Sequence, residues 1–326
     1  MNSIDEFVKQ FREVETELIK LIFRKVSEGK GVSYLAGQLA YLVGLKDVDK
    51  LIEAINISEE AVERLLRKEL PVLDIPIKAY QQGATNIDPL AFKSTFERIL
   101  FVKGNDLQKG LAVIRTKVKS AVRKEYVNVL TKAYIESISG AYSYDEAVRR
   151  AVRDLSDRGI KIAQYQTQEG KTINYNIESA VRRTLLTEIG DTSNQLQMAV
   201  IDELDSELVY VSQHLGARVT KRLDYTNHAW WQGRIYKRYG NSRYEDFYQK
   251  TGYGKIEGLK GINCRHYIYP YFEGISPEPP PPIPIGANRE VYDLQQEYNR
   301  LTRNYKKYKR RYDVLGEAKA YWEILL

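Results

Sequence analysis

The chain has 326 residues, 43% of them hydrophobic, which is enough to bury at least one sizeable core and more than a single typical domain needs. Its single cysteine excludes an internal disulfide, and no stretch reaches the roughly 18 consecutive apolar residues of a membrane span. The first residues are acidic where a signal peptide has a basic start, so we expect synthesis and use in the cytoplasm, or in an assembly built there. The net charge of +7 permits contact with nucleic acid, although charges of both signs are mixed along most of the chain.

Residues 1–104 are expected to form a helical region. Apolar residues from Ile4 to about Lys25 recur at steps of three and four, which predicts an amphipathic helix. The apolar stripe of this helix, with Phe7 and Phe11, fits either a core or a surface that docks onto a partner. Shorter helical patterns and two interrupting prolines follow: residues 33–43, 46–55 and 58–70, then Pro71 and Pro76.

Residues 105–204 have the most regular pattern and predict long helices over 106–140, 143–159 and 177–204. Gly140 and Gly159 are expected stops. The second helix opens with a capping box, in which Ser143 and Glu146 satisfy free backbone groups of the first turn.

After Leu204 the period shortens, and runs rich in Tyr, Val and Ile predict strands in a small α+β domain over 205–275. A proline-rich linker follows at 276–286, since this composition favours extended chain. Residues 287–326 then read as a basic helical tail. The fold class is therefore α+β and predominantly helical, with long N-terminal and central helices before the small β-containing domain and the tail.

All three histidines and the only cysteine lie in the small domain, as His214, His228, Cys264 and His266. Cys264 and His266 are two residues apart, so on a strand both would face one side and could reach one zinc ion. The distance of 14 residues between His214 and His228 lacks the tight pairing typical of structural zinc. A nucleophilic Cys264 lacks the local signatures of cysteine enzymes. The pattern favours a third interpretation, in which Cys264 is a small buried hydrophobe and the histidines hydrogen-bond the loops to one another, together with Arg218, Asn263 and Arg265.

A basic run in the tail, from Arg303 to Arg311, is interleaved with tyrosines. Such a run can contact DNA phosphates, with the aromatic rings stacking on bases, or it can be the solvated face of a helix. The solvated face is favoured, because no nucleic-acid-binding motif accompanies the run. The candidate DNA contacts are Lys306, Lys307, Lys309, Arg310 and Arg311.

Three ordered motifs, "HLGAR", "HAWWQGRIY" and "GINCRHYIYPYF", carry a resemblance to a known family. They resemble the phage minor capsid protein 2 family, minor head proteins akin to the F protein of phage Mu. The more distant Mu F group ends its motif in C-R-C where this chain has C-R-H. The matching positions are His214, Gly216, Ala217, Arg218, His228, Trp231, Gln232, Gly233, Ile235, Tyr236, Gly261, Asn263, Cys264, Arg265, His266, Tyr269, Pro270 and Phe272.

The resemblance implies a structural, non-enzymatic minor capsid protein of a tailed phage or prophage, made in the host bacterial cytoplasm. It implies a place inside the capsid near the portal, binding to the portal protein, contacts with the major capsid or other head proteins, and a part in head assembly or in DNA packaging and delivery. Residues 1–104 would then be the portal-docking region. No membrane partner and no cofactor are expected, apart from a possible zinc ion at His214, His228, Cys264 and His266.

Two alternatives remain from other classes of function. One is an internal head protein that binds packaged double-stranded DNA without sequence preference, through the basic tail. The other is a zinc-dependent hydrolase or injected effector centred on the Cys/His motif, which would need an open coordination position.

Overall fold

The computed structural model describes residues 3–30, 47–55, 57–70, 89–166, 172–261 and 264–317, with no side-chain description for 89–93 and 163–166. Long helices and two small antiparallel sheets confirm the predicted helical α+β class. The predicted helix at 33–43 and the breaks at Pro71 and Pro76 lie outside the described residues. The elements are α1 (Ser3–Glu28), α3 (Glu59–Glu69), α5 (Pro89–Ile138), α6 (Tyr144–Arg158), β1 (Lys161–Gln166), β2 (Thr172–Asn176), α7 (Ile177–Glu203), β3 (Leu208–Val211), α8 (His228–Trp231), β4 (Ile235–Lys237), α9 (Phe247–Thr251), β5 (Ile268–Tyr271) and α10 (Ile285–Leu315).

The chain forms two compact units, each assembled from distant segments. The first unit contains Met1–Ala61, Gln108–Thr184 and Leu301–Leu326, and the second contains Val62–Leu107 and Leu185–Arg300. Helices α5, α7 and α10 contribute residues to both units. The sequential domains expected from composition, with limits at 104, 204, 275 and 286, stay a prediction.

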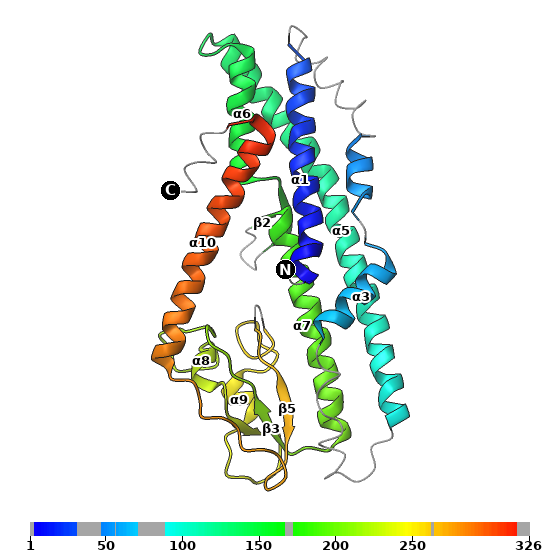
Figure 1. Ribbon diagram of the computed structural model, residues 1–326, viewed down its shortest axis with the longest axis vertical. Helices are drawn as coiled ribbons and strands as arrows, with labels where there is room; N and C mark the ends of the chain where they lie inside the picture. The colour runs from blue at the N-terminus through cyan, green and yellow to red at the C-terminus, as the bar shows by residue number, and fades with distance from the viewer. Residues whose placement is uncertain are drawn as a thin grey trace. The chain divides into compact units, whose positions relative to one another are not determined.

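In the first unit, α1 turns its apolar stripe into the core and lies alongside α6 (Figure 1). Phe11 and Leu18 are fully buried, as is Val26 at the other end of the stripe. The hydroxyl of Tyr144 donates a hydrogen bond of 2.7 Å to the carbonyl of Val26, which ties the start of α6 to the end of α1. Of the two alternatives for this stripe, the structure therefore shows core.

The predicted helix signals around α6 are present. Ser143 caps the helix by accepting a hydrogen bond from the backbone N–H of Glu146, at 3.3 Å. Gly140 and Gly159 both adopt positive φ, 71° and 69°, which a glycine tolerates without strain. The predicted stops at the two glycines are confirmed.

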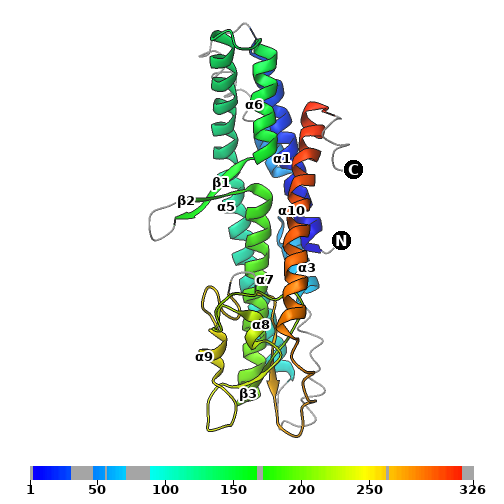
Figure 2. The same ribbon diagram turned by 90° about the vertical axis from the view of Figure 1, so that its left-hand side faces the viewer.

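An antiparallel hairpin of β1 and β2 follows α6, and the sequence analysis did not predict it. Its register pairs Ile162 with Tyr175, with an irregularity between Ala163 and Tyr165. Figure 2 shows the hairpin extending away from the helices of the first unit. Among the hairpin side chains that the structure describes, at 161–162 and 172–176, Ile162 is the buried one, and strands of six and five residues give a weak periodicity signal.

The second unit centres on a three-stranded antiparallel sheet in the order β4-β3-β5, at the predicted strand-like runs. Val209 on the central strand pairs with Tyr236 on one side and Pro270 on the other. Pro270 is tolerated because β5 is an edge strand, where a missing N–H breaks no ladder bond. The core on this sheet consists of Ile201, Val209, Val211, Trp231, Tyr236, Phe247, Leu259 and Ile268.

Helix α7 and the proline-rich segment are both fastened to this sheet region. The side chain of Gln197 on α7 accepts the N–H of Ile268 at 2.7 Å, at the start of β5. Gln213 accepts the N–H of Ile283 at 2.7 Å and donates to the carbonyl of Pro281 at 2.9 Å. The predicted linker is thus held by one glutamine immediately before α10 begins. Within the described ranges, no helix is both long and apolar enough to cross a membrane.

Candidate functional site

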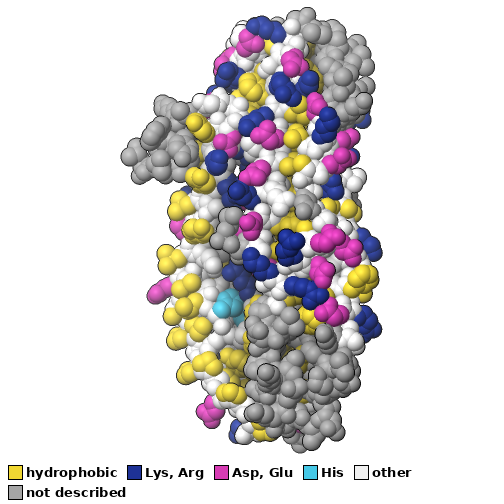
Figure 3. All heavy atoms as spheres, turned by 45° about the vertical axis from the view of Figure 1, so that its right-hand side comes forward, with side chains coloured by type: hydrophobic (Ala, Val, Ile, Leu, Met, Phe, Trp, Pro, Cys, Tyr) yellow, Lys and Arg dark blue, Asp and Glu magenta, His cyan; other side chains and the backbone are white. Residues whose placement is uncertain are grey.

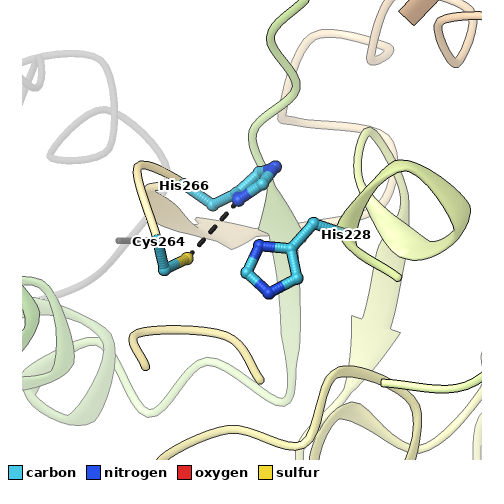
Figure 4. Close-up of side chains that lie close together, drawn as sticks. All are labelled: His228, Cys264 and His266. Carbon is cyan, nitrogen blue, oxygen red and sulfur yellow. Dashed lines mark hydrogen bonds between the residues drawn. The ribbon is translucent and has the colours of Figure 1, made fainter. Parts of the chain in front are cut away.

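The second unit brings the three histidines and the cysteine together, from segments that border its sheet. His214 follows β3, His228 opens α8, and Cys264 and His266 lie in the extended segment before β5. The expected strand at Cys264 is wrong, since β5 starts only at Ile268, but both side chains still reach one cluster. Figure 4 shows His266 beside Cys264, with the Nδ1 edge of His228 facing both.

Three of these side chains lie within reach of a common point. One ligand atom each from His228, Cys264 and His266 lies within 4.8 Å of the others, and Cys264 Sγ is 3.4 Å from His266 Nδ1. His214 stacks against His266 with a ring-centroid distance of 4.5 Å, at the side of this group of three. The structure thus brings His228, Cys264 and His266 close together and places the ring of His214 beside them; metal binding by the four residues stays a prediction.

Gln232, a motif residue that is 1% exposed, sets the proton positions of His266. Its side-chain oxygen accepts the backbone N–H of His214 at 3.0 Å, which identifies that atom as the oxygen and not the amide nitrogen. His266 Nε2 lies 3.0 Å from the same oxygen and must donate to it. A neutral His266 therefore has a free lone pair on Nδ1, the atom that faces Cys264.

The other two histidines are fixed in the same way. His228 Nε2 donates to the carbonyl of Glu257 at 2.9 Å, which leaves its Nδ1 unprotonated. His214 Nδ1 donates to the carbonyl of Leu215 at 3.0 Å. The Nε2 atom of His214 is buried and has no hydrogen-bond partner within the described part of the chain.

Burial keeps the histidines neutral and the cysteine protonated. Desolvation lowers the pKa of all three imidazoles, to about 4 for His228, and outweighs the hydrogen bonds to the carbonyls of Leu215 and Glu257 that act to raise the pKa of His214 and His228. Burial raises the pKa of the Cys264 thiol, against the opposing effect of hydrogen bonds and of nearby Lys260 and Arg218. A protonated thiol is a poor nucleophile, so the site as it stands does not activate Cys264 for attack.

Trp231 and Arg218 lie next to the cluster. Trp231 is 1% exposed and donates its indole N–H to the carbonyl of Tyr225 at 2.9 Å. Arg218 donates to the carbonyl of Glu257 at 3.1 Å, the same carbonyl that orients His228. Arg265 is exposed, and Asn263 lies outside the described residues.

Two of the three motif glycines are required by backbone conformation. Gly216 and Gly233 have φ values of 77° and 71°. A Cβ on Gly233 would lie 2.5 Å from the side-chain oxygen of Gln213. Any other residue at 233 would therefore be strained and would displace the glutamine that holds the proline-rich segment.

Asn288 is a residue of this region that sequence reasoning missed. It is fully buried on α10, where its amide oxygen accepts the N–H of Ala217 at 3.0 Å and its amide nitrogen donates to the carbonyl of Ala217 at 2.8 Å. An asparagine near the start of a polar helix gives no sequence signal of this role. It fastens the "HLGAR" loop to α10.

The five predicted DNA-contact residues all lie near carboxylates of the first unit. Lys306 pairs with Glu178, Lys309 with Asp313 at 2.8 Å, and Arg310 with Glu15 at 3.6 Å. Lys307 and Arg311 both face Asp157. On the face drawn in Figure 3, cationic and anionic side chains are likewise intermixed. DNA contact through these residues stays a prediction.

Comparison with known proteins finds one family whose sequence profile covers nearly the whole chain. The sequence profile of the family described as phage minor capsid protein 2 matches residues 2–322. The chain belongs to this family. The resemblance to this family that the three motifs carry is therefore confirmed.

Two relatives of the chain are proteins of Lactococcus phages. A "Structural protein" of Lactococcus phage LL-H is 23% identical over 210 residues, covering 61% of this chain and 53% of the relative. A "Structural protein" of Lactococcus phage mv4 is 33% identical over 81 residues, covering 24% of this chain and 65% of the relative. The matches thus span between about half and two thirds of the relatives' lengths. No solved structure matches the chain.

Proposed function

We propose that this protein is a structural, non-catalytic component of a phage head, held inside the capsid near the portal and acting by binding other head proteins. The observation that carries the proposal is the family match over residues 2–322, which includes both units. The names of the two Lactococcus phage relatives support the same class of function.

The chemistry of the Cys/His cluster supports a structural role. The pKa of Cys264 is raised by burial, which disfavours the thiolate that nucleophilic catalysis needs. Among the described residues, the close group of His228, Cys264 and His266 contains no carboxylate that could serve as a general base. The hydrolase alternative takes no support from this geometry.

Portal binding is proposed for an exposed apolar face of α10. Leu294, Tyr298, Leu301 and Tyr305 follow one another at steps of four, three and four, and are 71%, 68%, 53% and 43% exposed. This spacing is that of a helix face which packs against another helix. Large exposed apolar residues at such a spacing favour a protein partner.

Residues 1–104 were expected to dock onto the portal, and the structure narrows which side chains could do so. The apolar stripe of α1 is buried in its own unit. The large hydrophobic residues that the described part of this region exposes are Phe101 and Val102 on α5, at 63% and 49%. We propose these two residues as the portal contacts within residues 1–104.

Co-expression with the portal protein of the same phage tests the proposal. We expect the two proteins to elute together in size-exclusion chromatography. Leu294→Asp with Tyr298→Asp should weaken the complex by at least about tenfold, as the loss of central apolar contacts does at other interfaces. Leu223→Asp, at an equally exposed leucine outside α10, is the control.

Location is tested separately on assembled particles. Mass spectrometry of purified heads and purified tails should find the protein in the heads, in few copies relative to the major capsid protein. Its presence in tails alone, or its absence from particles, would contradict the proposal. Unchanged portal binding by the α10 variant would remove α10 from the docking surface.

A further inference from the structure

We propose that His228, Cys264 and His266, with His214 as fourth ligand, form a structural site for a zinc ion. The ligand atoms of His228, Cys264 and His266 converge from α8 and from the segment before β5, and the ring of His214, which follows β3, lies beside that of His266. An ion bound there would cross-link all three segments. This role is distinct from portal binding and does not depend on it.

The distances are close to those of a tetrahedral ion. Zinc bonds of about 2.3 Å to sulfur and about 2.0 Å to nitrogen put neighbouring ligand atoms about 3.5 Å apart. Cys264 Sγ and His266 Nδ1 are already 3.4 Å apart, and the whole group of three lies within 4.8 Å. Shifts on the order of 1 Å in the side chains of His228, Cys264 and His266 bring their ligand atoms to zinc-bonding distances.

The hydrogen bonds around the cluster orient the histidines as metal ligands. His266 donates its Nε2 proton to Gln232, and His228 donates its Nε2 proton to the carbonyl of Glu257. Donation from the far nitrogen to a carbonyl oxygen is how metal-binding histidines are commonly fixed. Both rings therefore present a bare Nδ1 without any change of tautomer.

His214 supplies the fourth position. Its Nδ1 proton is directed to the carbonyl of Leu215, so the remaining lone pair is on Nε2. This atom is buried and has no hydrogen-bond partner within the described residues, which is costly for a polar atom. A metal bond would remove that cost. The ring of His214 lies against that of His266, 4.5 Å between centroids.

The ligand set selects the class of metal. Imidazole nitrogen and thiolate sulfur suit Zn²⁺, whereas Mg²⁺ and Ca²⁺ need several oxygen ligands. Binding takes the proton from Cys264, so the S–H bond breaks, a Zn–S bond forms and one proton passes to the solvent. Four protein ligands leave no open position for substrate water, which fits a structural and not a catalytic site.

Cobalt substitution of the untagged protein gives a specific test, because the chain contains one cysteine. Titration with Co²⁺ should produce the visible bands of a tetrahedral ion and a near-ultraviolet sulfur-to-cobalt charge-transfer band, saturating at one ion per chain. Cys264→Ser should abolish the charge-transfer band. Met198→Leu, which alters the same core without removing a ligand, should leave both signals unchanged.

Zinc itself is measured by elemental mass spectrometry after growth with added zinc. We expect one ion per chain, a melting temperature lowered by a chelator, and loss of both in His228→Ala and Cys264→Ser. Gln232→Leu should weaken affinity by about 10–100-fold through loss of ligand orientation. His214→Ala should also weaken it.

Circular dichroism distinguishes ligand loss from unfolding. Cys264→Ser is nearly isosteric and should keep the helical spectrum of the wild type. A folded wild-type protein without zinc and without a charge-transfer band in cobalt would overturn the proposal. Full zinc retention by Cys264→Ser would overturn it as well, and unchanged affinity in His214→Ala would exclude His214 as fourth ligand.

Discussion

The side-chain oxygen of Gln232 accepts two hydrogen bonds at once, from the backbone N–H of His214 and from the ring of His266, each 3.0 Å long. One buried acceptor thus connects the loop after β3 to the segment before β5 and determines which nitrogen of His266 is free. The acceptor itself comes from the end of α8.

Replacing Gln232 with leucine should destabilise the metal-free protein by about 2–4 kcal/mol, because two buried donors lose their acceptor. Urea unfolding of the chelator-treated protein measures this change. Gln249→Leu, at an exposed glutamine on α9, should change the unfolding free energy by less than about 0.5 kcal/mol. Equal effects of the two variants would show that the Gln232 hydrogen bonds are not stabilising.

The buried pair of Glu15 and Arg310 gives a second prediction. Glu15 is fully buried; burial raises its pKa, and Arg310 opposes that shift from 3.6 Å. Arg310→Met should cost about 3–5 kcal/mol, because it leaves a buried carboxylate without a partner charge.

A second substitution at the same pair tests the cause. Glu15→Gln keeps an acceptor for the N–H of Ile160, which now donates to Glu15 at 2.8 Å. Added to Arg310→Met, it should recover most of the lost stability. Lys309→Met, which removes an exposed ion pair with Asp313, should cost at most about 1 kcal/mol. If the double variant does not recover stability, then lost packing, and not the unpaired charge of Glu15, causes the destabilisation by Arg310→Met.

Acid stability should depend on Glu125. Burial acts to raise the pKa of Glu125, but hydrogen bonds of 2.6 and 2.5 Å from Arg158 outweigh it and leave that pKa lowered. A lowered folded-state pKa stabilises the protein above the unfolded value of about 4.3, and that stability is lost as the pH falls through the folded value. Melting temperatures of the wild type and of Glu125→Gln should therefore converge as the pH falls below about 4. Parallel curves would contradict the prediction.

Contact with DNA through the basic cluster can be measured by fluorescence anisotropy with duplex DNA at low salt. Each of the five cations already faces a carboxylate, so we expect weak binding. Strong binding that falls steeply with added salt, and is lost when the five residues are changed to glutamine, would support the DNA alternative.

Periodicity predicted the helices well because their buried faces repeat every three or four residues, as in α1 and α7. It missed the hairpin of β1 and β2, whose strands of six and five residues are short for a periodicity signal. It also placed a strand at Cys264 that the structure does not have, because Tyr and Ile downstream carry the β signal.

The sequence predicted which residues form the candidate site, but not which hydrogen bonds hold them in place. The motifs identified His214, His228, Cys264 and His266, and the structure brings them together. Their hydrogen-bond partners could not be predicted, since Glu257 contributes only a backbone carbonyl and Asn288 is 71 residues away from Ala217. The carboxylate partners of the α10 cations were unpredictable for the same reason, because long-range pairing leaves no local pattern.

Gln213 and His214 are consecutive residues, and this adjacency couples two parts of the second unit mechanically. Gln213 holds the chain at Pro281 and Ile283, directly before α10, through two hydrogen bonds. A displacement of the chain at the start of α10 therefore acts on the side chain of Gln213. The peptide bond between Gln213 and His214 passes it on to the His214 ring of the Cys/His cluster. By thermodynamic reciprocity, whatever stiffens that cluster also resists displacement of the helix.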